Sequence, residues 1–184
     1  MRLLSVNVGT PREMARSRGR PVLSGIIKEP VQGPVIVRKL NLDGDRQADL
    51  SVHGGEDKAV YAYPSEHYGY WRERFPGRDM PWGTFGENFT TEGLLENEVH
   101  IGDRLVIGSA EFAVTQPRFP CYKLGIRFET NTMVKWFLES ERSGFYLKVL
   151  GEGQVRAGDA IKHVRANRHS ETITSIVRMV KRSG

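Results

Sequence analysis

Short runs of β-branched and alternating residues recur along most of the chain, and this feature limits the folds open to it more than any other. Glycine, proline, asparagine and aspartate separate the runs, as expected for strands joined by turns. The predicted strands cover residues 2–8, 22–28, 34–40, 58–63, 103–108, 110–116, 144–150 and 154–164. Strands this short and this regularly spaced predict a mainly β, α+β fold with an antiparallel barrel-like or sandwich sheet.

Three segments have helical rather than strand periodicity. Residues 64–75 begin with Pro-Ser and gather three aromatic residues on one face, and residues 130–142 open with a capping threonine or asparagine. The third segment spans 170–182 and carries an apolar stripe of Ile173, Ile176, Val177 and Val180. We expect these helices to lie at the periphery of the sheet, with the third docked on another surface or part of a longer helical module.

Two stretches of the chain share the pattern V-x-x-G-D before an apolar run. They are ENEVHIGD at 96–103 and EGQVRAGD at 152–159. Glycine tolerates positive φ and aspartate accepts backbone hydrogen bonds, so the pattern predicts a tight turn between strands. Two such units support a barrel-like sheet.

Composition places the chain among ordinary globular proteins. With 184 residues, 39% hydrophobic and 27% charged, it is long enough to bury a core of its own as one domain. A single cysteine excludes an intrachain disulfide, and the N-terminus lacks the apolar core of a signal peptide. No apolar run reaches the roughly 18 residues of a membrane span. We therefore expect a cytoplasmic protein with no membrane partner.

The formal net charge of +5 is unevenly distributed. Residues 51–120 carry 6 basic and 11 acidic side chains, whereas residues 121–184 carry 12 basic and 6 acidic ones. A basic excess suits nucleic acid or an anionic small molecule, but no nucleic-acid-binding module is evident in the sequence. The charge therefore favours a small anion over nucleic acid. The basic tail from Lys162 to Arg182 is either a solvated helix face or a docking surface for an acidic partner.

The stretch LSVHGGEDKAVYAY at 50–63 is the first that can carry chemistry. Its two glycines allow a sharp turn or a close approach to a ligand, and outward N–H groups of such a loop can hold an anion. A lone histidine is a weak metal site, because zinc takes three or four ligands. The pattern leaves a structural turn and a ligand loop open, with candidate residues His53, Gly54, Gly55 and Lys58.

The stretch WGTFGENF at 82–89 places Glu87 and Asn88 directly after a glycine. These two side chains can satisfy local backbone groups in a turn or cap. Alternatively, the adjacent carboxylate and amide can hydrogen-bond the edge of a heterocycle such as a pterin or purine. Spacing alone slightly favours the local role and leaves both open.

The only cysteine lies in TQPRFPCYKLGIRFE at 115–129. Two prolines stiffen the loop around Arg118, which we expect to be a surface residue. Arg118, Lys123 and Arg127 place three cations near Cys121, and neighbouring cations favour the thiolate. The thiol could be a small buried hydrophobe, a nucleophile or a ligand for a soft metal, and the cations favour the last two.

Taken together, these stretches resemble the MOSC-domain family, in its YiiM-like branch. The motifs that carry the resemblance are VHGG at 52–55, GEN at 86–88, IGD at 101–103 and PRFPC at 117–121, in this order. The resemblance implies a MOSC β-barrel domain over residues 1–165, with its core at about 20–165. Residues 166–184 would form a C-terminal helix at the place where the family has a small three-helix module, so that this chain is a shortened variant or a truncated one.

The resemblance also implies a cofactor, the molybdenum cofactor, in which a pterin dithiolene holds the metal. Cys121 matches the cysteine that ligates molybdenum in related proteins, which gives it a catalytic and metal-binding role. The pterin phosphate would be clamped by nearby cations, namely Arg118, Lys123, Arg127 and Lys58. Glu87 and Asn88 would hydrogen-bond the pterin, while His53, Gly54 and Gly55 would line the opposite wall. The family is also classed with pyridoxal-phosphate-binding proteins, and we assign no residue to that cofactor.

The implied activity is the reduction of small N-hydroxylated compounds, such as hydroxylaminopurines, to amines. A separate electron-donor protein would supply the electrons, because one cysteine cannot hold an iron–sulfur cluster. The three-helix module could support donor docking or a homodimer. Two alternatives remain open: a cofactor or sulfur carrier with a persulfide on Cys121, and an interaction domain that has lost the cofactor.

Overall fold

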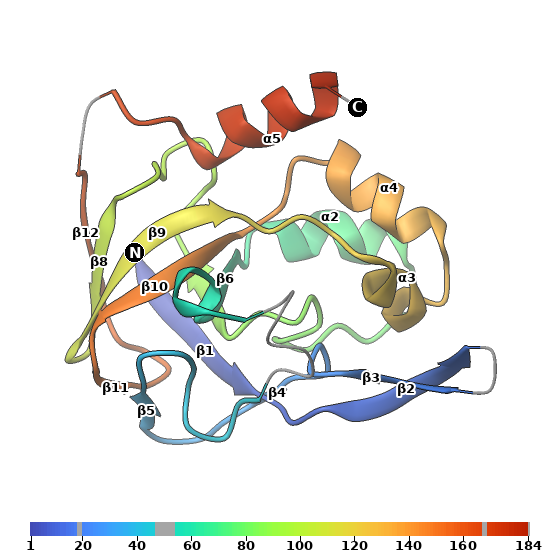
Figure 1. The fold of residues 1–184 in the computed structure, drawn as a ribbon, viewed down its shortest axis with the longest axis horizontal. Coiled ribbons are helices and arrows are strands. Elements are labelled where there is room, and N and C mark those ends of the chain that lie inside the picture. The colour runs from blue at the N-terminus through green and yellow to red at the C-terminus, as the bar shows by residue number, and fades with distance from the viewer. Residues whose placement is uncertain (18–19, 47–53, 167–168, 184) are drawn as a thin grey trace.

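A computed structural model describes residues 1–17, 20–46, 54–166 and 169–183, and Figure 1 follows the chain from blue to red. The strands are β1 (Arg2–Val8), β2 (Arg12–Ser17), β3 (Arg20–Ser24), β4 (Glu29–Pro30), β5 (Val35–Val37), β6 (Val60–Pro64), β7 (Phe89–Glu92), β8 (Arg104–Ile107), β9 (Ala110–Pro117), β10 (Phe145–Gly151), β11 (Gly153–Val155) and β12 (Ile161–Val164). The helices are the 3₁₀ turn η1 (Glu56–Lys58), α2 (His67–Arg74), α3 (Tyr122–Phe128), α4 (Thr132–Glu139) and α5 (Ile173–Ser183). No helix in the described ranges combines the length and the apolar composition that a bilayer crossing requires.

Eight strands form one mixed sheet in the order β12-β8-β9-β10-β6-β7-β1-β4. Strands β6 and β7 pair in parallel, and the other neighbours are antiparallel. Backbone hydrogen bonds link the start of the chain to the region where β12 begins: the Leu3 N–H donates to the Asp159 carbonyl at 2.9 Å, and the Ile161 N–H to the Met1 carbonyl at 3.1 Å. The predicted α+β class is confirmed. The sheet curls like a barrel, but in the described part of the chain no pair of named strands closes it.

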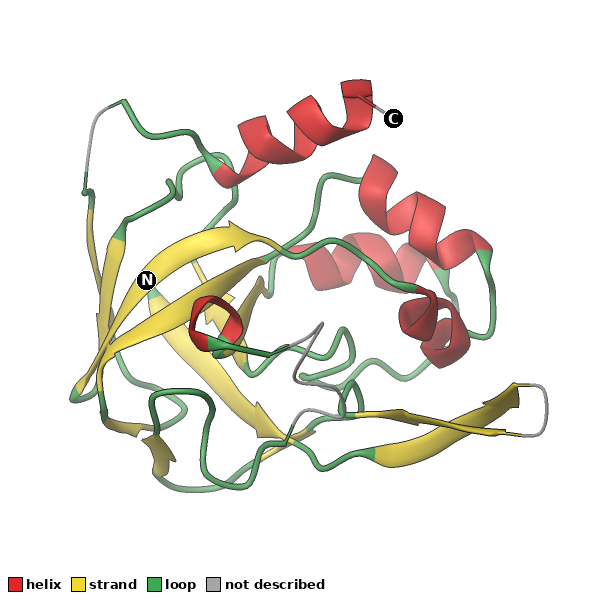
Figure 2. Ribbon diagram, in the orientation of Figure 1, coloured by secondary structure: helices red, strands yellow, loops and turns green. Residues whose placement is uncertain are grey.

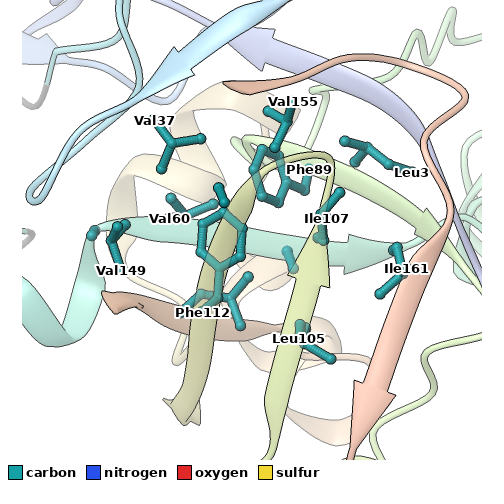
Figure 3. Packing of buried hydrophobic residues seen from close by; sticks show 14 of the residues in the cluster. Leu3, Val37, Val60, Phe89, Leu105, Ile107, Phe112, Val149, Val155 and Ile161 are labelled. Carbon is teal, nitrogen blue, oxygen red and sulfur yellow. The ribbon is translucent and has the colours of Figure 1, made fainter. Parts of the chain in front are cut away.

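Strand β6 separates two hydrophobic cores, because alternate side chains of a strand point to opposite faces of the sheet. Val60 and Ala62 enter the first core, and Tyr61 and Tyr63 enter the second. The first, the aliphatic core, includes Leu3, Val37, Val60, Phe89, Leu105, Ile107, Phe112, Val149, Val155 and Ile161, which Figure 3 labels. The second, the aromatic core, includes Tyr61, Tyr63, Tyr68, Trp71, Phe85, Phe128, Met133 and Phe137.

Helices α2, α3 and α4 lie together at one end of the sheet and supply much of the aromatic core (Figures 1 and 2). Trp71 of α2 stacks on Phe137 of α4 with ring centroids 5.8 Å apart. The helices predicted over 64–75, 130–142 and 170–182 correspond to α2, α4 and α5. The sequence missed α3, whose seven residues directly follow a stretch with two prolines and were interpreted as loop.

Several strand predictions were wrong in their bounds. The run at 154–164 is two strands, because the turn at Gly158 and Asp159 ends β11 and lets β12 join another sheet. The run at 22–28 ends as a strand at Ser24, and the segment after it leaves the β2–β3 hairpin. Strands β2, β4 and β7 had no sequence signal strong enough to predict them.

The two V-x-x-G-D turns are confirmed. Gly102 and Gly158 have φ of 86° and 96°, a region that side chains rarely adopt. In the first turn Asp103 accepts the backbone N–H of His100 at 2.9 Å, and in the second Asp159 accepts that of Arg156 at 2.9 Å.

Helix α5 docks on the rest of the protein through part of its apolar stripe. Ile173 and Val177 are buried, whereas Val180 is 45% exposed. At its end, Arg178 and Lys181 each reach Glu141 at 2.8 Å. Two cations of the basic tail therefore pair within the chain.

Candidate functional site

A pocket opens beside the aromatic core, where several distant segments of the chain meet. It encloses about 690 Å³, counting the solvent at its mouth. Its walls are Ser24, Gly25, Ile26, Lys28, Asp45, Lys58, Tyr61, Phe85, Gly86, Asn88, Arg118, Phe119, Cys121, Lys123 and Tyr146. Tyr61 of β6 and Tyr146 of β10 are cross-strand partners on the face of the sheet that carries the aromatic core. The strand alternation that separates the two cores therefore also builds this part of the pocket wall.

Five of the residues singled out from the sequence meet in this pocket. They are Lys58, Asn88, Arg118, Cys121 and Lys123. They come from three separate stretches, and only the fold brings them together. The pocket therefore joins a thiol, an amide and three cations in one place.

Among the described residues, the candidates Gly54, Gly55, Glu87 and Arg127 do not line this pocket. Gly54 and Gly55 precede η1, and Gly55 has a φ of 95°, as a turn requires. Arg127 is half-buried on α3, and its backbone carbonyl accepts a hydrogen bond from the Arg78 guanidinium. His53 lies outside the described residues.

Glu87 is fully buried next to the pocket rather than in its wall. Its carboxylate accepts the Tyr68 hydroxyl, the backbone N–H of Gly83 at 2.8 Å and that of Phe85 at 3.1 Å. The Thr90 hydroxyl adds a further bond at 3.0 Å. Burial raises the pKa of Glu87, and these hydrogen bonds oppose the shift. Glu87 thus holds the 83–90 turn that supports the pocket.

Arg118 is buried, and the expectation of a surface arginine was wrong. Only 6% of the residue is exposed, because the guanidinium lies over the rings of Tyr61, at 5.5 Å, and Phe137, at 5.0 Å. Its Nη1 has no hydrogen-bond partner among the described residues. Burial lowers the pKa of Arg118, but nearby ionisable groups, Tyr61 first, outweigh it and raise the net value. The guanidinium therefore stays charged and keeps an unused donor, an arrangement suited to an anion.

Cys121 is half-buried and directly precedes α3. Its backbone is extended, and its carbonyl accepts the Leu124 N–H at 2.9 Å in the first turn of the helix. The thiol is thus fixed at a helix start rather than in the stiff loop that the two prolines suggested. Within the described ranges, no group of three or more His, Cys, Asp and Glu side chains is arranged to hold a metal ion.

Sequence reasoning missed an ion pair in the pocket wall, between Lys28 and Asp45. Both side chains are buried, with exposed fractions of 7% and 2%. The Asp45 carboxylate also accepts the Gly9 N–H at 2.9 Å and the Asn88 side-chain amide at 2.9 Å. Asn88 is fixed in turn, since its Oδ1 accepts the Tyr61 N–H at 3.1 Å. Nothing in the spacing of Lys28 and Asp45 could reveal the pair, because only the tertiary fold joins them.

Two glycines lock the segment that carries Lys28. Gly83 and Gly86 have φ of 88° and 83°. A Cβ on Gly86 would lie 2.6 Å from Ile26 Cγ1, and one on Gly83 would lie 2.8 Å from the Lys28 carbonyl oxygen. The GTFGEN stretch therefore needs glycine at both places to let residues 26–28 pack against it.

Comparison with known proteins places these features in a family. The MOSC domain model matches residues 49–162. The chain is 43% identical over 156 residues to protein YflK of Bacillus subtilis, which covers 85% of this chain and 70% of that protein. It is 32% identical over 182 residues to a protein named Reductase from Gibberella moniliformis, covering 97% of this chain but 32% of that one.

The fold agrees with the sequence matches. The crystal structure of YiiM from Geobacillus stearothermophilus superposes with a TM-score of 0.80 at 37% identity. The match covers 99% of this chain and 84% of that one. At this identity and coverage, the likeness extends to sequence and fold together.

Proposed function

This chain belongs to the MOSC domain family, and from that premise we propose that it is an oxidoreductase that holds the molybdenum cofactor with Cys121 as the protein ligand to the metal. One observation carries the proposal: the only thiol and a buried guanidinium with an unused N–H group line the same pocket. Thiolates are soft ligands that suit such a metal centre. A guanidinium is the side chain best suited to phosphate, which the pterin carries.

The residues present fit the cofactor. Cys121 would ligate the metal, and Arg118 would bind the phosphate, with Lys58 and Lys123 adding positive charge. Asn88 lines the same wall, and its predicted hydrogen bond to the pterin remains part of this proposal. When bound, the cofactor supplies redox chemistry at the metal, while the chain binds and orients the reactants.

We propose as substrates small N-hydroxylated compounds, such as hydroxylaminopurines, which would be reduced to the amines. The resemblance to the YiiM-like branch supports this, as does the relative named Reductase. Aromatic side chains in the pocket also support it, because Phe119 and Tyr146 can pack against a flat heterocycle. The electrons would come from a separate donor protein.

The test is the metal content of the protein. The chain is produced together with the enzymes of cofactor synthesis and purified without oxygen, and molybdenum and pterin are measured per protein. We expect both in the wild type and a loss of most molybdenum in Cys121→Ser. Val164→Ala, at an exposed position outside the pocket, is the control and should keep the wild-type content.

Wild-type protein without molybdenum or pterin would contradict the proposal. A labile sulfur adduct on Cys121 in metal-free protein, detected by mass spectrometry, would instead support a sulfur carrier. Salt-dependent nucleic-acid binding that survives Cys121→Ser would favour an interaction domain.

A further inference from the structure

The Lys28–Asp45 pair is buried at a cost in folding free energy, which points to a role in the pocket. Removing two charges from water carries a penalty that their attraction often fails to repay. Here the pair lies in the wall of the proposed site, with exposed fractions of 7% and 2%. Buried charges in a cleft are candidates for a role in chemistry.

The ammonium of Lys28 has N–H groups that its hydrogen bond to Asp45 does not use. It carries three N–H groups, and in the described part of the chain the Asp45 carboxylate is the hydrogen-bond acceptor of Lys28 Nζ. Asp45 itself accepts hydrogen bonds from the Gly9 N–H and the Asn88 amide, so the carboxylate that positions the ammonium is itself held in place. The remaining N–H groups are available to a molecule in the pocket.

The surroundings of Lys28 favour easy loss of its proton. Burial lowers the pKa of Lys28, against the charge and hydrogen bond of Asp45 and the charge of Glu87. The other titratable groups that line the pocket are Lys58, Tyr61, Arg118, Cys121, Lys123 and Tyr146. Three of these, Lys58, Arg118 and Lys123, are cationic side chains.

Other proton donors in the pocket fit less well. Burial raises the pKa of Tyr61 and of Tyr146, and the Tyr61 hydroxyl already donates to the Ser143 carbonyl at 2.8 Å. Arg118 does not release its proton at physiological pH. Lys58 and Lys123 are half-buried and therefore more exposed to solvent than Lys28, which is buried.

We propose that Lys28, held in place by Asp45, is the proton donor to the departing oxygen of the N-hydroxylated substrate. This inference rests on the proposed function. Two electrons from the external donor break the N–O bond, the oxygen takes the proton of Lys28 and leaves as water, and the nitrogen takes a second proton from solvent. The neutral Lys28 then regains its proton from solvent, so each turnover consumes two electrons and two protons.

The test compares Lys28→Arg with the wild type, both loaded with molybdenum. Arginine keeps the charge and the pairing with Asp45 but cannot release a proton. We expect similar molybdenum content and a fall in kcat of about 100-fold or more, as for loss of a general acid. The alkaline fall in the kcat–pH profile of the wild type should be absent from the variant. Lys135→Arg, on the exposed face of α4, is the control.

A second readout does not depend on activity. In cofactor-free protein with ¹³C-labelled lysine, the resonance missing from Lys28→Arg should titrate below the ordinary pKa of a lysine side chain. If Lys28→Arg proves unstable, Lys28→Met/Asp45→Asn removes both charges and should show the same loss of kcat.

Several results would overturn the inference. They are a kcat of Lys28→Arg within threefold of the wild type, an unchanged pH profile, or titration of Lys28 at the ordinary pKa of a lysine side chain. If the wild type contains molybdenum and is active, and Lys28→Arg gives one of these results, this inference alone is overturned. Wild type without molybdenum and without reductase activity overturns the proposed function and this inference with it.

Discussion

The two faces of β6 lead to different kinds of interior. Val60 and Ala62 face the aliphatic core, which is built mainly from side chains of the curled sheet. Tyr61 and Tyr63 face the aromatic core, where polar groups are buried along with rings. There the Trp71 indole N–H donates to the Tyr63 hydroxyl at 2.7 Å, and Arg118 lies over Tyr61. One strand, through simple alternation, thus serves two environments.

The contrast indicates that the aliphatic core mainly stabilises the fold, whereas the aromatic side carries the candidate site. Apolar burial is the main favourable contribution to folding, so the aliphatic core should dominate stability. Buried charges such as Lys28, Asp45 and Arg118 add little net stability and lie where the pocket needs them. Substitutions on the two sides should therefore separate loss of stability from loss of the site.

The largest expected effect on stability lies in the aliphatic core. Phe112→Ala removes a fully buried ring that meets Phe89 edge-on, so it should lower the free energy of unfolding by about 3–5 kcal/mol. Urea denaturation followed by tryptophan fluorescence measures this. Val106→Ala, at a 37% exposed position on the neighbouring strand, should have little effect. A similar loss in both variants would contradict the proposed role of the aliphatic core.

The second effect concerns the ion pair of the pocket wall. Asp45→Asn leaves the buried Lys28 ammonium without its counter-charge and should cost about 3 kcal/mol of unfolding free energy. Lys28→Met/Asp45→Asn removes both charges and should return to within about 1 kcal/mol of the wild type. Urea denaturation of the two variants and of Lys28→Met completes a double-mutant cycle. If the double variant were as unstable as Asp45→Asn, the pair would be a stabilising element, and the contrast between the two sides would weaken.

The smallest effect on stability should accompany a large effect on the site. Arg118→Met keeps apolar contact with Tyr61 and Phe137 while removing a buried charge, so the free energy of unfolding should change by about 1 kcal/mol or less. The molybdenum and pterin content should fall clearly. The control is Arg104→Met, an exposed position on β8, which should leave both properties unchanged. Full occupancy in Arg118→Met would remove this arginine from the phosphate site.

The sequence was informative where local rules apply. Alternation marked β1, β6, β8, β9 and β10, which line much of the aliphatic core, and the V-x-x-G-D pattern marked two turns with Gly at positive φ. Helical spacing marked α2, because two aromatic residues of that helix, Tyr68 and Trp71, are buried together. The short helix after Cys121 had no such periodic signal.

The site was harder to predict because it depends on tertiary contacts. The sequence predicted three cations near Cys121, and two of them, Arg118 and Lys123, line the pocket with it. The burial of Arg118 over Tyr61 and Phe137 could not be predicted, because it depends on β6 and α4. The partners of Asp45 lie far away in the sequence, at Gly9, Lys28 and Asn88. Sequence distance carries no information on such pairs, so the contacts of Asp45 in the pocket wall could be identified only from the fold.

The most direct measurement of the central claim is molybdenum X-ray absorption on the loaded protein. In the wild type, the spectrum should report one more sulfur ligand to the metal than in whatever molybdenum Cys121→Ser retains. That result would identify the thiol before α3 as the protein ligand. Equal sulfur coordination in the two proteins at equal occupancy would contradict the account.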